Sequence, residues 1–220
     1  MGVARPLLII MNPRRIPECM SALESLPISK LWIERYTEHQ ITDLLPGLIN
    51  ECDYDPIGII SDDSLPTAEA LRLVLEHYVD GEVVTAYCNV DQQSSIVNLS
   101  TEPLKVQDMA TLDCYTMPTR EDVEASPTEK VRTWFAGHTL TFMSRDLWVK
   151  YPFVSIGGGN GSQSDYSMSC RLQLDDVPIW AVRGAFVQHL KAVVDVVEQD
   201  GIRRLLIGVE EPGIRWDECA

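Results

Sequence analysis

Short apolar runs recur along the first ninety residues, with polar or helix-forming segments between them. A run of four to six such residues between breakers is typical of a strand buried in a sheet. The expected strands are 7–11 (LLIIM), 57–60 (IGII) and 83–88 (VVTAYC), and the shorter run 31–33 (LWI) is a further strand candidate. The first is followed by a basic loop that contains two prolines.

Two amphipathic helices are expected between these strands. Thr37 opens a capping box, and apolar residues spaced three and four apart follow from 41 to 52. The second helix has Pro66 in its first turn and either Asp63 or Ser64 as its N-cap. Strands that alternate with helices predict an α/β fold with a mostly parallel central sheet flanked by helices.

The second half of the chain continues this pattern after a polar, irregular excursion at 91–130. The remaining expected elements are an extended segment at 134–143, a short helix from 144, a glycine-rich loop at 156–164, a helix at 165–174, a strand at 179–189 and a final helix at 190–197 stopped by Gly201. A length of 220 residues fits one domain over 1–220. Its expected parts are 1–90, the excursion 91–130, a second half 131–200 and a C-terminal tail 201–220.

Acidic residues are concentrated in the middle of the chain. The net charge is −15, and residues 38–129 hold 19 acids and 3 bases, a net −16. This charge repels phosphate backbones and disfavours nucleic acid as a partner. The longest early apolar run, 6–11, is too short to span a bilayer, and no cleavable signal peptide is recognised, so we expect a cytoplasmic protein. The six scattered cysteines indicate reduced, mostly buried thiols.

Two adjacent acids, Asp62 and Asp63, leave the end of the third predicted strand. In open α/β sheets, ligands bind beyond the carboxyl ends of the strands. One acid at this place is explained by helix capping, but two successive carboxylates repel each other unless a cation or donor lies beside them. Capping and metal binding are both open for Asp63.

Asp165 and His189 are the downstream candidates. Asp165 follows the glycine-rich loop at the start of a helix, and His189 ends a strand 24 residues later. Carboxylate and imidazole together suit Mn²⁺ or Mg²⁺ with open positions for phosphate oxygens. A satisfied surface histidine is the alternative.

Three segments together resemble a known family, the GT-A-fold nucleotide-sugar glycosyltransferases and family 2 in particular. They are "IGIISDDSLPTAEALRLVLEHY", "WFAGHTLTFMSRDLWVKYPF" and "SDYSMSCRLQLDDVPIWAVRGAFVQHLK". The resemblance covers roughly residues 5–192 in order, without the middle excursion. It implies a GT-A (Rossmann-like) fold with a nucleotide-sugar-binding half at 1–90 and a small acceptor-side subdomain in the second half.

The resemblance also implies a reaction and roles. A sugar would pass from a nucleoside-diphosphate donor to an acceptor hydroxyl, on a glycan, a lipid-linked sugar or another molecule, with inversion. Asp63 and His189 would bind the divalent cation, Asp62 would contact ribose or metal, and Asp165 would be the general base. The motif reads Ser-Asp-Asp-Ser, not Asp-x-Asp, which leaves open which of the two acids binds the metal.

Further candidates lie after the first two strands. Asn12, Arg14 and Arg15 are candidates for contacts with the donor, and the family resemblance implies a nucleobase contact at Glu34; an exposed surface role is the alternative for each. The glycine-rich loop is interpreted as a mobile lid, since it lacks the Gly-Lys-Ser/Thr ending of a phosphate loop. Three residues, Trp134, His138 and Trp180, line the acceptor site or belong to the core.

Two other functions compete with glycosyl transfer. A sugar-phosphate nucleotidyltransferase shares the broad fold, but the chain has no glycine-rich, lysine-bearing signature after its first strand. A catalytically inactive nucleotide-sugar-binding module is the second alternative, because the acidic motif is imperfect.

Overall fold

The computed structural model describes residues 5–12, 15–90, 94–105, 116–154, 163–190, 196–199, 202–205 and 212–219. An eight-stranded sheet has the strand order β12-β2-β1-β3-β7-β5-β8-β6. Its strands are β1 (Leu7–Asn12), β2 (Ser29–Glu34), β3 (Ile57–Ser61), β5 (Val83–Tyr87), β6 (Lys130–Thr133), β7 (Thr141–Met143), β8 (Ile179–Phe186) and β12 (Gly213–Asp217). Two small sheets pair β4 (Ser64–Leu65) with β9 (Gln188–His189), and β10 (Val196–Gln199) with β11 (Ile202–Leu205).

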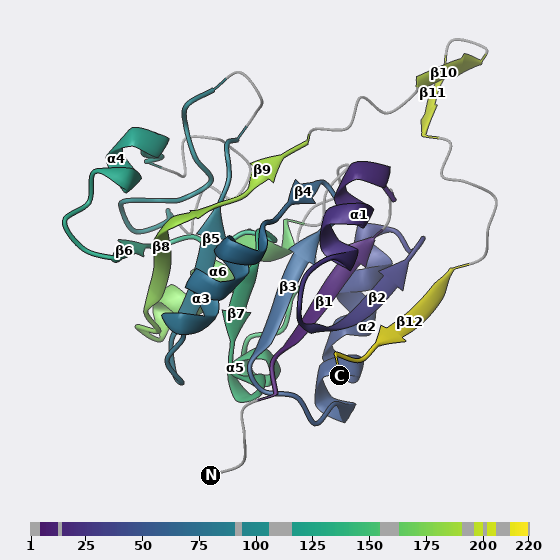
Figure 1. Ribbon diagram of the computed structural model, residues 1–220, viewed down its shortest axis with the longest axis horizontal. Coiled ribbons are helices and arrows are strands. Elements are labelled where there is room, and N and C mark those ends of the chain that lie inside the picture. The colour runs from purple at the N-terminus through teal and green to yellow at the C-terminus, as the bar shows by residue number, and fades with distance from the viewer. Residues whose placement is uncertain are drawn as a thin grey trace.

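Helices lie on both faces of the large sheet (Figure 1). They are α1 (Pro17–Glu24), α2 (Glu38–Glu51), α3 (Ala68–Glu76), α4 (Arg120–Glu124), α5 (Arg145–Lys150) and α6 (Ser164–Leu174). Leu7 and Ile9 of β1 pack with α2, α5 and α6, whereas Leu8 and Ile10 pack with α1 and α3. Because both faces are covered, the central strands β1, β3 and β5 are apolar at most positions, and this is why short apolar runs located them. In the part of the chain that is described, no helix has the length and apolar character needed to cross a bilayer.

The sheet is mixed, which corrects the prediction of a mostly parallel sheet. Four neighbouring pairs are antiparallel (β12–β2, β3–β7, β5–β7, β6–β8) and three are parallel (β1–β2, β1–β3, β5–β8). Since β7 is antiparallel to both β3 and β5, those two strands run in the same direction. Apolar periodicity reports burial and carries no information on direction, so β7 was not recognised as an antiparallel strand inserted between two parallel groups. Five strands nevertheless run in the same direction, so their carboxyl ends lie at the same end of the sheet: β1, β2, β3, β5 and β8.

Gly58 of β3 lies directly against β7. Its cross-strand partner is Phe142, and a Cβ at position 58 would lie 2.3 Å from the ring atom Cζ. We expect Gly58→Ala to lower the free energy of unfolding by about 1–3 kcal/mol, because a buried ring must be displaced. Urea denaturation measures this loss. Gly47→Ala is the control: that site in α2 has no atom within 4 Å of the added Cβ, and Ala favours a helix.

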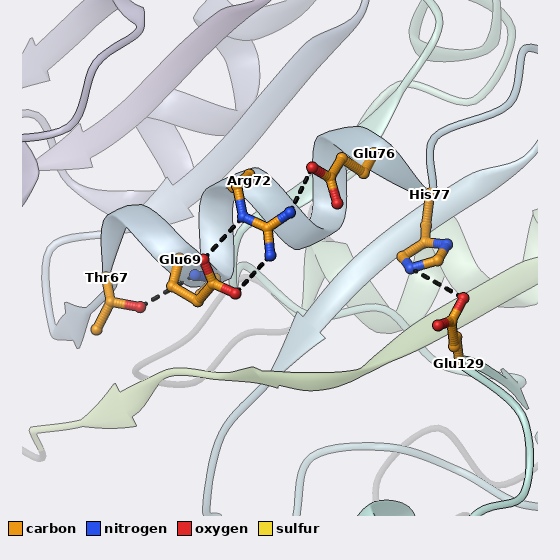
Figure 2. A network of polar contacts seen from close by, with 7 residues as sticks. Thr67, Glu69, Arg72, Glu76, His77 and Glu129 are labelled. Atoms are coloured by element: carbon orange, nitrogen blue, oxygen red, sulfur yellow. Dashed lines mark hydrogen bonds and ion pairs between the residues drawn. The ribbon is translucent and has the colours of Figure 1, made fainter.

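The N-terminus of α3 settles how that helix is capped. Thr67 is the N-cap, and its Oγ1 accepts the backbone N–H of Ala70 at 3.0 Å. Figure 2 shows this cap together with Arg72, which lies between Glu69 and Glu76 on the exposed side of the helix. The expectation that Asp63 or Ser64 caps this helix is wrong, because residues 64–65 form strand β4 and the helix begins three residues later.

The C-terminal part differs from the prediction. Residues 196–199 form β10, antiparallel to β11, so residues 196 and 197 of the expected final helix lie in a strand. Residues 191–195 of that expected helix lie outside the described residues. The sequence between these strands is Asp200-Gly201, a strong hairpin signal, and the flanking Val196, Val197 and Ile202 favour strands over helices. The predicted tail likewise contributes β12, which pairs antiparallel with β2 at the edge of the sheet.

Candidate functional site

A cavity of about 310 Å³ lies beyond the ends of β3 and β5. It is lined by Asp63 and Ser64 at β4, His189 in β9, the segment after β5, the loop before β7 and the first turn of α6. Its lining residues are Glu38, Ser61, Asp63, Ser64, Cys88, Asn89, Val90, Asn98, Phe135, Gly137, His138, Thr139, Asp165 and His189. The structure therefore brings Asp63, His189 and Asp165 to one cavity, although they are far apart in sequence.

Strand pairing holds Asp63 and His189 together. Ser64 of β4 is opposite His189 of β9, and Leu190 donates its N–H to the Asp63 carbonyl at 2.7 Å. The His189 Nε2 lies 3.1 Å from the Asp63 Oδ2, and both side chains are largely buried, with 19% and 13% of their surface exposed.

The second ring nitrogen of His189 faces an acceptor. Its Nδ1 lies 3.2 Å from the backbone carbonyl oxygen of Asn89, so Nδ1 must carry the hydrogen of that bond. A neutral imidazole in this tautomer directs the Nε2 lone pair at the Asp63 carboxylate. Two facing electron pairs need a proton or a metal ion between them, and a histidine held by a backbone carbonyl is the usual form of a metal ligand.

Asp165 approaches the cavity from the first turn of α6. Its Oδ1 accepts the backbone N–H of Tyr166 at 2.8 Å, which fixes the carboxylate. Its Oδ2 lies 3.6 Å from where a Cβ would stand on Gly137, and the same position is 3.1 Å from the Asn98 Nδ2. The absence of a side chain at Gly137 thus leaves room between a carboxylate and an amide.

Asn98, Cys88 and Thr139 form a polar wall that the sequence did not point to. The Asn98 Oδ1 accepts the Cys88 N–H at 2.8 Å, and its Nδ2 donates to the Thr139 Oγ1 at 2.9 Å. Asn98 lies in the segment interpreted as an irregular excursion, and no spacing signal connects it to the other site residues. Burial raises the pKa of the Cys88 thiol to about 12, with a further rise from the negative charge of Asp63. Cys88 is therefore a neutral thiol at physiological pH and a poor nucleophile.

Asp62 points away from the cavity. Its side chain is fully buried, and its Oδ2 accepts the backbone N–H of Arg15 at 2.6 Å. Its own N–H donates to the Met11 carbonyl at 3.0 Å. The two successive acids thus have different surroundings: Asp62 fixes the loop that follows β1, and Asp63 lines the cavity.

The other predicted donor contacts lie near the ends of β1 and β2. Asn12 is fully buried and donates an Nδ2 hydrogen to the Glu34 Oε1 at 3.4 Å. Its Oδ1 is also buried, and no described residue donates a hydrogen bond to it. Glu34 also lies 4.0 Å from Arg215 of β12. Arg14 lies outside the described residues, and so do residues 156–162 of the predicted glycine-rich loop at 156–164. The last two residues of that loop are the N-cap and first residue of α6.

The three aromatic candidates for the acceptor site lie in two different places. His138 lines the cavity, and its ring packs against Phe153 with centroids 4.7 Å apart. Trp134 and Trp180 do not line it; both stack with the Arg132 guanidinium instead.

A cation at this site would have few protein ligands. Among the described residues, no three His, Cys, Asp or Glu side chains come together as a metal-binding group. Asp63 and His189 supply one oxygen and one nitrogen, a set compatible with Mn²⁺ or Mg²⁺ when the remaining positions are taken by water or a ligand's phosphate oxygens.

Comparison with known proteins gives little further information. No protein-family model matches the chain, and no curated protein matches it. Among solved structures, the chain is similar to the crystal structure of A197 from STIV, with 14% sequence identity, 81% of each chain covered and a TM-score of 0.48.

Proposed function

We propose that the chain is a metal-dependent, inverting glycosyltransferase with a GT-A-like fold. It would move a sugar from a nucleoside-diphosphate donor to an acceptor hydroxyl. The observation that carries this proposal is the convergence of Asp63, His189 and Asp165 on one cavity at the strand ends. The cavity volume of about 310 Å³ is at the lower end of the range for small-molecule sites.

Asp63 and His189 are the residues that would hold the cation. They are in contact, and His189 is oriented by the Asn89 carbonyl so that its Nε2 faces the carboxylate. Two protein ligands leave coordination positions for diphosphate oxygens. A divalent cation, when bound, neutralises the negative charge that grows on the leaving nucleoside diphosphate.

Asp165 is the proposed general base. Its carboxylate is fixed by the Tyr166 N–H and faces the space left by Gly137. As the acceptor oxygen bonds to the anomeric carbon, its proton passes to Asp165, and the bond from that carbon to the diphosphate oxygen breaks. A single displacement of this kind inverts the anomeric centre.

Donor nucleotide contacts are proposed at the ends of β1 and β2. Asn12 and Glu34 are joined by a hydrogen bond there, and the buried Asn12 Oδ1 is an acceptor for a ligand N–H or O–H. Arg14 and Arg15 follow Asn12 closely in the sequence, and their charge suits the diphosphate. Asp62 supports this segment through its bond to Arg15, so its proposed contribution to donor binding is indirect.

Donor turnover tests the proposal. The chain is incubated with a panel of nucleoside-diphosphate sugars, and we expect release of nucleoside diphosphate that falls at least about tenfold when Mn²⁺ is removed by EDTA. Thermal unfolding in the same panel identifies the donor, because a ligand that binds only the folded state raises the melting temperature.

The alternatives give different results in the same experiment. Binding without release indicates a nucleotide-sugar-binding module. Exchange of pyrophosphate into the nucleotide sugar indicates a nucleotidyltransferase. No stabilisation by any donor, with or without Mn²⁺, contradicts all three.

A further inference from the structure

β12 is the outermost strand of the large sheet, beside β2 (Figure 1). An edge strand presents backbone N–H and C=O groups that can pair with another strand. Proteins commonly block such edges with like charges, and β6 at the opposite edge carries Lys130 and Arg132. β12 instead carries one base and one acid, Arg215 and Asp217.

The pairing register defines which backbone groups of β12 point outward. Arg35 donates its N–H to the Asn12 carbonyl in β1, so odd-numbered residues of β2 face β1 and even-numbered ones face β12. The residues opposite the even-numbered ones in β12 are 213, 215 and 217. The N–H and C=O groups of Ile214 and Trp216 therefore point away from the sheet.

The side chains of these same two residues are exposed apolar groups. Ile214 has 41% and Trp216 47% of its surface exposed, whereas most other large apolar residues of the sheet are buried. Trp216 stacks on Tyr54 with ring centroids 6.1 Å apart, which holds the indole in a fixed orientation. Ile214 and Trp216 thus combine backbone groups that point away from the sheet with exposed apolar side chains that lie on one face of it.

We infer that β12 pairs antiparallel with β12 of a second copy of this chain, around a twofold axis that passes between the two Trp216 residues. In this register Trp216 and its copy exchange backbone hydrogen bonds, and so do Ile214 and Glu218. Arg215 of one copy then lies opposite Asp217 of the other, twice in the interface. Opposite charges that face each other across strands are favourable.

The charge pattern selects this register over the two neighbouring symmetric ones. Centring the axis on Arg215 would place two guanidinium groups opposite each other, which is unfavourable. Centring it on Asp217 would place two carboxylates opposite each other, which is also unfavourable. The sequence of β12 is thus self-complementary in one antiparallel register.

The interface is short, because β12 has five residues. Interfaces that bury less than about 1,200 Å² belong mainly to weak or transient complexes. We therefore expect a dimer that dissociates on dilution and that joins two large sheets into one continuous sheet.

A cysteine cross-link tests the register. Position 213 lies opposite 219 of the second copy, at a non-hydrogen-bonded pair where Cα atoms are about 4.5 Å apart, within the range for a disulfide. Gly213 has no atom within 4 Å of an added Cβ, and Cys219 is exposed. Under mild oxidation, Gly213→Cys should yield a covalent dimer, and the additional change Cys219→Ser should abolish it. Failure of Gly213→Cys to cross-link at high concentration overturns the register.

Sedimentation velocity tests the pairing itself. The wild-type chain should shift from monomer to twice that mass as concentration rises. Ile214→Pro removes an N–H that points outward, so β12 should stay on β2 while the dimer dissociates at least tenfold more readily. Ile214→Ala, which keeps the N–H, should weaken the dimer less, and circular dichroism checks that both variants are folded. A wild-type chain that stays monomeric, or an Ile214→Pro variant that dimerises as well as wild type, overturns the inference.

Discussion

Asp165→Asn is expected to lower the rate of sugar transfer by about 10²- to 10⁴-fold and to leave donor affinity unchanged. The amide has nearly the same shape as the carboxylate, and its oxygen can still accept the Tyr166 N–H that fixes the side chain. It cannot take a proton from an acceptor hydroxyl. Donor affinity is measured by calorimetry in the presence of Mn²⁺, and transfer by product formation under saturating donor.

The position of Asp165 gives this prediction a matched control. Asp146 is an exposed acid in the first turn of another short helix, α5, and does not line the cavity. Asp146→Asn removes the same charge from the first turn of a helix and should leave the rate of sugar transfer and the donor affinity unchanged. Transfer at the wild-type rate by Asp165→Asn would exclude Asp165 as the base.

Asp63→Ala is expected to abolish the part of donor binding that depends on Mn²⁺. The change removes the only carboxylate that contacts His189 in the described structure, and it leaves one imidazole to hold a divalent cation. Loss of a cation ligand weakens the diphosphate contact that the cation supports. Calorimetric titration of the donor with Mn²⁺ and with EDTA should give the same weak affinity for the variant, whereas the wild-type chain should show two different affinities.

His189→Ala should have the same effect in kind, because the two residues would act on one ion. In the presence of Mn²⁺, the double variant should then bind the donor as tightly as either single variant, which distinguishes a shared ion from two independent contacts. Asp43→Asn, at an exposed acid of α2 away from the cavity lining, controls for the change in net charge. Equal donor affinities of wild type and Asp63→Ala in the presence of Mn²⁺ would remove the metal role.

The sequence located the strands and main helices well where burial on both faces leaves a continuous apolar run. β1, β3 and β5 fall within one residue of their expected bounds, and the capping box at Thr37 starts α2 as expected. The helix α1 was missed, because only Cys19 and Leu23 of its eight residues are buried, which is too few for a clear period. Strand direction, and with it the mixed sheet, has no local signal at all.

The candidate site was only partly predictable. Asp63 at a strand end and His189 at the end of a later strand are visible in sequence, and both line the cavity. That Asp62 turns inward depends on a bond to the backbone of Arg15, a contact between residues 47 positions apart. Asn98 and Gly137 are set beside Asp165 by tertiary packing alone, so nothing in their local sequence marks them.

The contact between Asp63 and His189 joins positions 126 residues apart, and it exists because β4 pairs with β9. Contacts of such sequence separation carry a large loop-closure entropy and tend to form late in folding. A chain still emerging from the ribosome has Asp63 long before His189 has been synthesised. The site should therefore form only after His189 has been synthesised, when every strand of the large sheet except β12 has already been synthesised.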